Sequence, residues 1–96
     1  MERGARMNAK QGKATPFHIA WIAAETPDET VQIVVFDSIE YRIPVFEADT
    51  GIPADAGASE ISHRATELLE NDGEFVVHTM EPHGSGFAAV VEQRRA

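Results

Sequence analysis

The stretch TVQIVVFDSIEYRIPVFEA, residues 30–48, constrains the fold of this chain more than any other segment. It begins with a run of β-branched and aromatic side chains, which favours an extended strand. Asp37 and Ser38 then form a turn-prone pair, after which apolar and polar residues alternate. We interpret the stretch as two strands of a hairpin, with one long bent strand as the alternative. Pro44 lacks an amide hydrogen, so the second strand is expected at a sheet edge or bulged there.

The segment FHIAWIAAE, residues 17–25, is compatible with either a strand or a helix. A helix would be capped by Thr15 and would start at Pro16. Two aromatic residues, two isoleucines and the turn-rich TPDET that follows favour the strand. In a strand, alternation places four side chains on one face: Phe17, Ile19, Trp21 and Ala23.

A helix is predicted over residues 59–72, after a loop at residues 49–58 that is rich in glycine, proline and aspartate. Asp55 or Ser59 is the expected cap at its start, and Gly73 is expected to end it in the left-handed conformation. The apolar residues of this segment recur at helical spacing and form a single stripe: Ile61, Ala65, Leu68 and Leu69.

Residues 79–87, TMEPHGSGF, contain the side-chain types of acid–base chemistry, metal binding and nucleophilic attack. Strands are predicted on both sides, at residues 74–80 and 87–93, and the glycines and proline between them suit a hairpin connection. A phosphate-binding loop would lead into a helix, and a nucleophilic serine would need an oriented base. We therefore interpret the stretch as a turn rather than an active site.

These elements predict an α+β fold, with an antiparallel sheet of about five strands and one main helix packed on one face. The expected order along the chain is strand, strand, strand, helix, strand, strand. Ninety-six residues suit one domain, which we place at residues 15–96 after a flexible basic arm at residues 1–14.

The sheet is expected to carry more apolar side chains than one helix covers, and this surplus predicts a homodimer. The residues that cannot all face the helix are Ile22, Val34, Phe36 and Val90 or Val91.

Charge is distributed unevenly along the chain. The first thirteen residues carry four cations against Glu2, whereas the remainder carries four arginines against fifteen acids, and the net charge is −8. So acidic a body argues against direct nucleic-acid binding. The chain has no cysteine and no apolar run long enough to span a membrane, so we expect a cytoplasmic protein without disulfides.

No motif identifies a family or a cofactor, and the leading hypothesis is a non-catalytic protein-binding or regulatory module. Its partner would be met by an edge strand and its exposed aromatic residues. The expected contact residues are Trp21, Tyr41, Arg42 and Phe46.

Two alternatives remain open. The first is a small ligand-binding or metal-dependent enzyme, although no HExxH motif is present. The second is an acidic mimic that occupies a basic partner. A ligand or metal site in the first alternative would combine five side chains: His63, Glu67, His78, Glu81 and His83.

Overall fold

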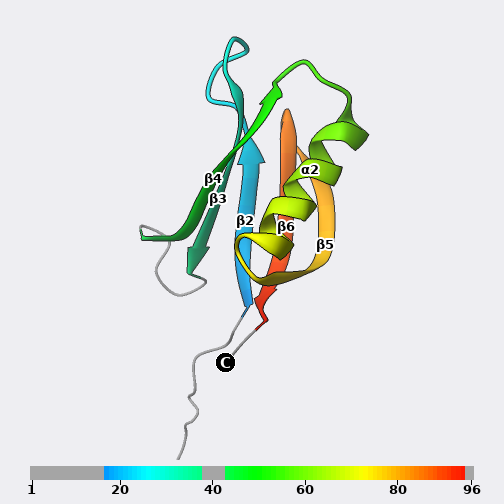
Figure 1. Ribbon diagram of the computed structural model, residues 1–96. Coiled ribbons are helices and arrows are strands. Elements are labelled where there is room, and N and C mark those ends of the chain that lie inside the picture. The colour runs from blue at the N-terminus through cyan, green and yellow to red at the C-terminus, as the bar shows by residue number, and fades with distance from the viewer. Residues whose placement is uncertain (1–16, 38–42, 95–96) are drawn as a thin grey trace, which may run out of the picture.

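The computed structural model describes residues 17–37 and 43–94. Figure 1 shows a single sheet with one helix lying across it. The elements are the strands β2 (Phe17–Ala23), β3 (Thr30–Asp37) and β4 (Pro44–Pro53), the helix α2 (Ala58–Asn71), and the strands β5 (Phe75–His83) and β6 (Gly86–Gln93).

The five strands form one antiparallel sheet in the order β4-β3-β2-β6-β5. Consecutive strands joined by short loops pair with each other, whereas α2 connects the two edge strands and crosses one side of the sheet (Figure 1). The predicted α+β class, element order and single covering helix are confirmed. The segment at residues 17–23 is a strand, which settles the ambiguity between strand and helix.

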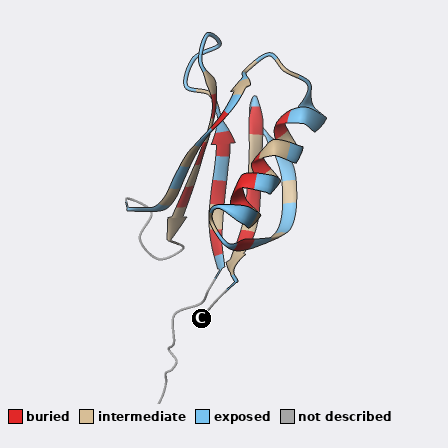
Figure 2. Cartoon of the chain, viewed as in Figure 1, coloured by how far each residue is buried: buried red, intermediate tan, exposed pale blue. Residues whose placement is uncertain are grey.

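The core lies between α2 and the sheet. Figure 2 shows that the buried residues alternate along the central strands and line the inner side of the helix. The predicted helical stripe is buried as expected, at Ile61, Ala65, Leu68 and Leu69. The strand residues with zero exposure are Ala20, Ile22, Ile33, Val35 and Val91. Ile22 and Val91 therefore belong to the covered face, and not to the surplus.

Strand β4 extends further than the sequence predicted, because it continues through residues 49–53, which the sequence analysis treated as loop. The buried Thr50 hydroxyl donates a hydrogen bond of 2.8 Å to the carbonyl of Val31, which ties this part of β4 to β3. Pro44 begins the strand at the sheet edge, and a register shift lies beside it. The edge position predicted from Pro44 is confirmed, whereas the strand expected at residues 39–42 falls outside the described residues.

The ends of α2 differ from the predicted caps. Gly57 is the N-cap, in place of Asp55 or Ser59, and it makes no side-chain cap hydrogen bond. At the other end Glu74, and not Gly73, is left-handed, with φ of 59°. A Cβ on Gly73 would lie 2.7 Å from the Cδ2 atom of Phe75, so glycine is needed there for space.

The stretch TMEPHGSGF is a β-hairpin, as predicted. The connection contains only two residues, Gly84 and Ser85, because His83 already pairs with Gly86. Gly84 has φ of 58°, as the first central residue of a type II′ turn requires. A Cβ on Gly86 would lie 1.9 Å from the carbonyl oxygen of Ile22, so β6 approaches β2 too closely there for any other residue.

Within the part of the chain that the structure describes, no helix is both long enough and apolar enough to span a bilayer. The basic arm predicted at residues 1–14 lies outside that part.

Candidate interaction face

The side of the sheet opposite α2, here called the open face, is covered by no element of the described chain. Alternation decides which side chains it carries, because residues that pair directly across strands point to the same side. On β2, the face consists of the four residues predicted to share it, Phe17, Ile19, Trp21 and Ala23, which alternate with the buried positions.

The pairing register arranges these side chains in rows across the sheet. One row joins Glu47, Val34, Trp21, Ala88 and Glu81 from edge to edge. In the next row, Ile19 lies between Phe36 and Val90. Two surplus residues of β3, Val34 and Phe36, and one of β6, Val90, therefore accompany the residues of β2 on this face. The middle of both rows is apolar. The first row ends in charged residues, whereas the second ends in Pro44 and Thr79.

Large apolar side chains on this face retain much of their solvent exposure. Trp21 is 37% exposed and Phe17 is 42% exposed. Val76 on β5 and Val45 on β4 are 37% and 46% exposed, so the apolar surface extends to both edges of the sheet. A contiguous surface of this kind is typical of a binding site.

Trp21 separates two environments at one end of the face. On one side, its ring contacts that of His83, with centroids 5.1 Å apart. The small residues of β6 between them, Ala88 and Gly86, leave room for this contact. On the other side is a depression of about 370 Å³, here called the Trp21 hollow, lined by Trp21, Ala23, Glu25, Glu29, Gln32, Val34 and Glu47.

The walls of the Trp21 hollow are acidic. Glu25 and Glu29 come from the loop between β2 and β3, where the amide of Glu29 donates a hydrogen bond of 3.2 Å to the carbonyl of Thr26. Glu47 reaches the hollow from β4. Three carboxylates beside an indole ring and a valine suit a cationic side chain, which gains from charge and from the face of the ring.

Asp49 extends the acidic region along β4. Its carboxylate accepts hydrogen bonds from the amide of Gly51, at 2.8 Å, and from the hydroxyl of Thr30, at 2.7 Å. The bond from Gly51, followed by that from Thr30, holds the pKa of Asp49 below its ordinary value. The carboxylate is therefore charged throughout the neutral range.

The opposite end of the open face carries a histidine. His78 lies at a register shift in β5, and its Nε2 atom is 2.7 Å from the Oε1 atom of Glu92. Its ring also contacts that of Phe17, with centroids 5.5 Å apart. This end pairs an acid with a histidine, whereas the Trp21 end concentrates carboxylates.

Both edges of the sheet contain features that oppose pairing with a further strand. β4 holds Pro44 and Pro53, and β5 holds Pro82. Register shifts occur in both edge pairings, between β3 and β4 and between β5 and β6. Prolines and bulges are the devices that protect edge strands. The geometry therefore favours contact through the open face over the strand addition that the sequence suggested.

The four predicted contact residues do not share one location in the structure. Trp21 lies on the open face, as the strand pattern indicated. Phe46 instead faces α2, where its ring packs edge-on against Phe75 at 5.9 Å, so it belongs to the core. Its position is inward because it pairs with the buried Val35. Tyr41 and Arg42 lie outside the described residues.

The five residues of the predicted ligand or metal site do not converge. His63 and Glu67 are exposed on α2, where Glu67 forms an ion pair of 2.9 Å with Arg64. His78, Glu81 and His83 are on β5, with His78 and His83 in contact with rings of the open face. The sheet separates the two sets. Among residues 17–37 and 43–94, no group of three or more histidine and acidic side chains could hold a metal ion.

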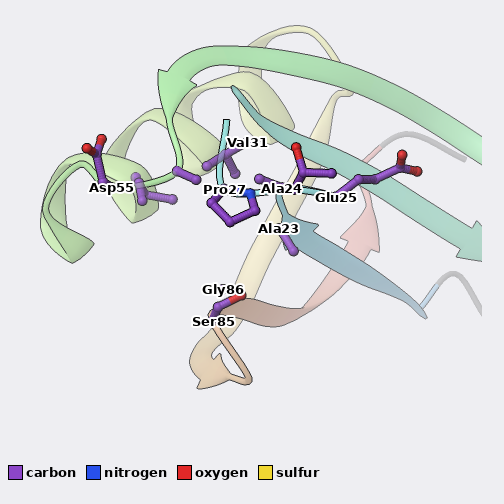
Figure 3. Close-up of a pocket in the computed structure, with 11 residues that line it drawn as sticks. Ala23, Ala24, Glu25, Pro27, Val31, Asp55, Ser85 and Gly86 are labelled. Atoms are coloured by element: carbon purple, nitrogen blue, oxygen red, sulfur yellow. The ribbon is translucent and has the colours of Figure 1, made fainter. Parts of the chain in front are cut away.

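A second cavity, of about 300 Å³, lies at the end of the sheet near the start of α2 (Figure 3). It includes Ser85 of the hairpin turn, but its walls are mainly alanine, proline and backbone. Figure 3 shows the carboxylates of Glu25 and Asp55 at its two sides, directed away from each other. No histidine is among the residues that line this cavity.

The sequence analysis missed the acidic walls of the Trp21 hollow. Glu25 precedes the four-residue turn at residues 26–29 and Glu29 ends it, so their convergence was inferable once the loop was recognised. The position of Glu47 could not be inferred from the sequence, because its place beside Val34 depends on the register between β3 and β4.

No protein-family model, curated protein or solved structure matches this chain.

Proposed function

We propose that this chain is a non-catalytic protein-binding module that forms a homodimer through its open face. The observation that carries the proposal is the continuous apolar surface of Trp21, Ile19, Phe36 and Val90, with no covering element in the described chain. Burial of such a surface against a second copy removes apolar area from water, which is the main driving force of association.

The dimensions of the sheet suit a dimer of modest affinity. Five strands make a face roughly 24 Å wide, and seven residues of strand are roughly 23 Å long. Two copies packed face to face would bury roughly 1,100 Å² in total, which is near the lower limit for specific interfaces. We therefore expect a dimer that dissociates at concentrations on the order of 1 µM.

Packing through this face would form a β-sandwich of the two sheets. The apolar side chains in the middle of the rows would be buried, and the charged ends would lie at the rim, as in other protein interfaces. Trp21 is a suitable anchor, because a large ring with a polar edge contributes much contact area for few rotatable bonds.

Light scattering on a size-exclusion column, over a range of protein concentrations, tests the proposal. The wild-type chain should shift from monomer to dimer. Ile19→Lys places a charge at the centre of the face and should abolish the dimer. Trp21→Ala should weaken it by about tenfold or more, in line with the loss of an interface anchor.

Asn71→Lys is the matched control, since it adds the same charge at the exposed end of α2. It should leave the dimer intact. Circular dichroism establishes that all three variants are folded. A wild-type chain that stays monomeric at every concentration, or a folded Ile19→Lys variant that dimerises normally, would contradict the proposal.

A further inference from the structure

We infer that dimerisation through the open face is coupled to protonation of His78 and His83, so that the dimer is tighter in mild acid. This inference deepens the proposed function and rests on it, because it needs two open faces to meet. It assigns a role to two exposed histidines that do not belong to the core. It depends on the sign of the charges on the face, and not on how the two copies are aligned.

The fixed charges that the described residues place on the open face are all negative. The carboxylates whose register turns them to this face are Glu47, Asp49, Glu81 and Glu92. The two arginines of the described chain are engaged elsewhere, Arg64 with Glu67 on α2 and Arg94 with the carbonyl of Glu70. Two copies that meet through this face therefore bring like charges together, and their repulsion opposes association.

His78 and His83 are the groups of this face that can offset the negative charge. Both are exposed on β5, where the ring of His83 contacts that of Trp21 and the ring of His78 contacts that of Phe17. Histidine is the side chain whose charge changes between about pH 5 and pH 8. Two imidazolium ions against four carboxylates would halve the net charge of the face.

The charged groups around both histidines are acidic. The Nε2 atom of His78 is 2.7 Å from the Oε1 atom of Glu92 on β6. Glu81 is two residues before His83 and lies on the same side of β5. The carboxylates beyond the Trp21 ring are those of the Trp21 hollow: Glu25, Glu29 and Glu47. A proton on either histidine meets one set of carboxylates in the monomer and two sets in the dimer, and this difference couples protonation to association.

The position of the histidines determines the sign of the effect. Strand β5 is an edge of the sheet, so both rings would lie at the rim of a face-to-face contact, where groups keep part of their water. In the monomer, 42% of the His78 side chain is exposed. A charge at the rim avoids most of the desolvation cost of a charge at the centre of an interface. We therefore expect attraction to outweigh desolvation.

The test measures the dimer dissociation constant of the full chain by sedimentation at pH 8 and at pH 6, in low salt. The wild-type dimer should tighten by about tenfold in acid, as expected if each of four histidines gains one exposed ion pair. The variant His78→Gln/His83→Gln cannot take up these protons, so its dissociation constant should change by less than about twofold. Each single variant should retain about a threefold change.

His63→Gln is the matched control, because His63 is exposed on α2, on the other side of the sheet. It should keep the full tenfold change. Salt provides a second readout, since screening weakens the repulsion between the two faces. Added salt should tighten the wild-type dimer at pH 8 and should have less effect at pH 6. Circular dichroism establishes that every variant is folded at both pH values.

The outcomes separate this inference from the proposed function. A wild-type chain that stays monomeric at both pH values overturns both. A dimer that changes by less than about twofold between pH 8 and pH 6, or that weakens in acid, overturns only the coupling. The inference is also wrong if folded His78→Gln/His83→Gln tightens in acid as much as the wild type, because other groups then take up the protons.

Discussion

Gly86 shows how one residue controls the approach of two strands. A Cβ at this position would lie 1.9 Å from the carbonyl oxygen of Ile22 and 3.1 Å from the Cα atom of Ala23. Both obstacles are backbone atoms in the middle of the sheet, which cannot rotate away as a side chain could. The position therefore tolerates only glycine.

Gly86→Ala is expected to destabilise the protein by about 3 kcal/mol or more, because β6 must move away from β2. Urea unfolding followed by Trp21 fluorescence measures the loss. Gly84→Ala is the matched control, since Gly84 has φ of 58° and nothing within 4 Å of an added Cβ. Its cost should be about 1–2 kcal/mol, from backbone conformation alone. Equal losses in the two variants would contradict the steric explanation.

Asp49 should contribute a pH-dependent part of the stability. Because its folded-state pKa is lowered, its stabilising effect is present above the pKa of the unfolded chain and is lost as pH falls through the folded value. Asp49→Asn should therefore be less stable than the wild type at pH 7, and the difference should shrink in acid.

The measurement is the urea midpoint at pH 7 and at pH 3 for the wild type and Asp49→Asn. Asp28→Asn, which removes an exposed carboxylate from the loop between β2 and β3, is the control. If the gap between Asp49→Asn and the wild type is the same at both pH values, the hydrogen bonds from Gly51 and Thr30 do not favour the charged form.

At the scale of the element, no side chain caps the start of α2, although one substitution would complete a capping box there. Gly57 is the N-cap, with φ of −64° and ψ of 148°, and Glu60 lies in the first turn. Serine adopts this extended conformation readily, and an added Cβ meets no atom within 4 Å. Ser-x-x-Glu is the capping-box pattern, in which two unpaired amides of the first turn gain partners.

Gly57→Ser should stabilise the protein by roughly 0.3 kcal/mol, because glycine is itself a tolerated N-cap. For a domain of this size, such a gain raises the midpoint of thermal unfolding by about 1–2 °C. Gly57→Ala offers a side chain without an oxygen and should give no such increase. A Gly57→Ala variant as stable as Gly57→Ser would assign the gain to reduced chain flexibility and not to capping.

At the scale of the whole molecule, a single helix covers only one of the two faces of the five-stranded sheet, and apolar side chains on the other face stay exposed. Helix α2 connects the two edge strands and covers one side of the sheet, so no element of the described chain covers the other side. We expect the protected edges to direct the proposed association to this face. The concentration series on the wild type and on Ile19→Lys therefore tests a consequence of the topology itself.

Much of the architecture was accessible from local patterns. The stripe of Ile61, Ala65, Leu68 and Leu69 fixed the helix, and alternation placed Phe17, Ile19, Trp21 and Ala23 on one face. These predictions succeeded because the periods of 3.6 and 2 are properties of the backbone. The end of β4 was missed because Gly51 and Pro53 resemble loop residues, whereas the Thr50 hydrogen bond to β3 depends on tertiary pairing.

The candidate site was less predictable than the fold. Trp21 was found from its strand, but Phe46 was assigned to the surface although it packs on Phe75. The histidines and glutamates of the predicted ligand or metal site lie on two sides of the sheet, which proximity in sequence does not indicate.

The sequence by itself determined the strands, the helix, the turn at Gly84 and the uneven charge, because each depends on neighbouring residues or on composition. Only the tertiary structure decided which apolar residues remain exposed and which carboxylates meet beside Trp21. The order β4-β3-β2-β6-β5 and the registers bring Glu47, Val34 and Trp21 into one row, although β4 and β2 are far apart in the chain. Such a juxtaposition depends on pairing between distant segments, which no local pattern specifies.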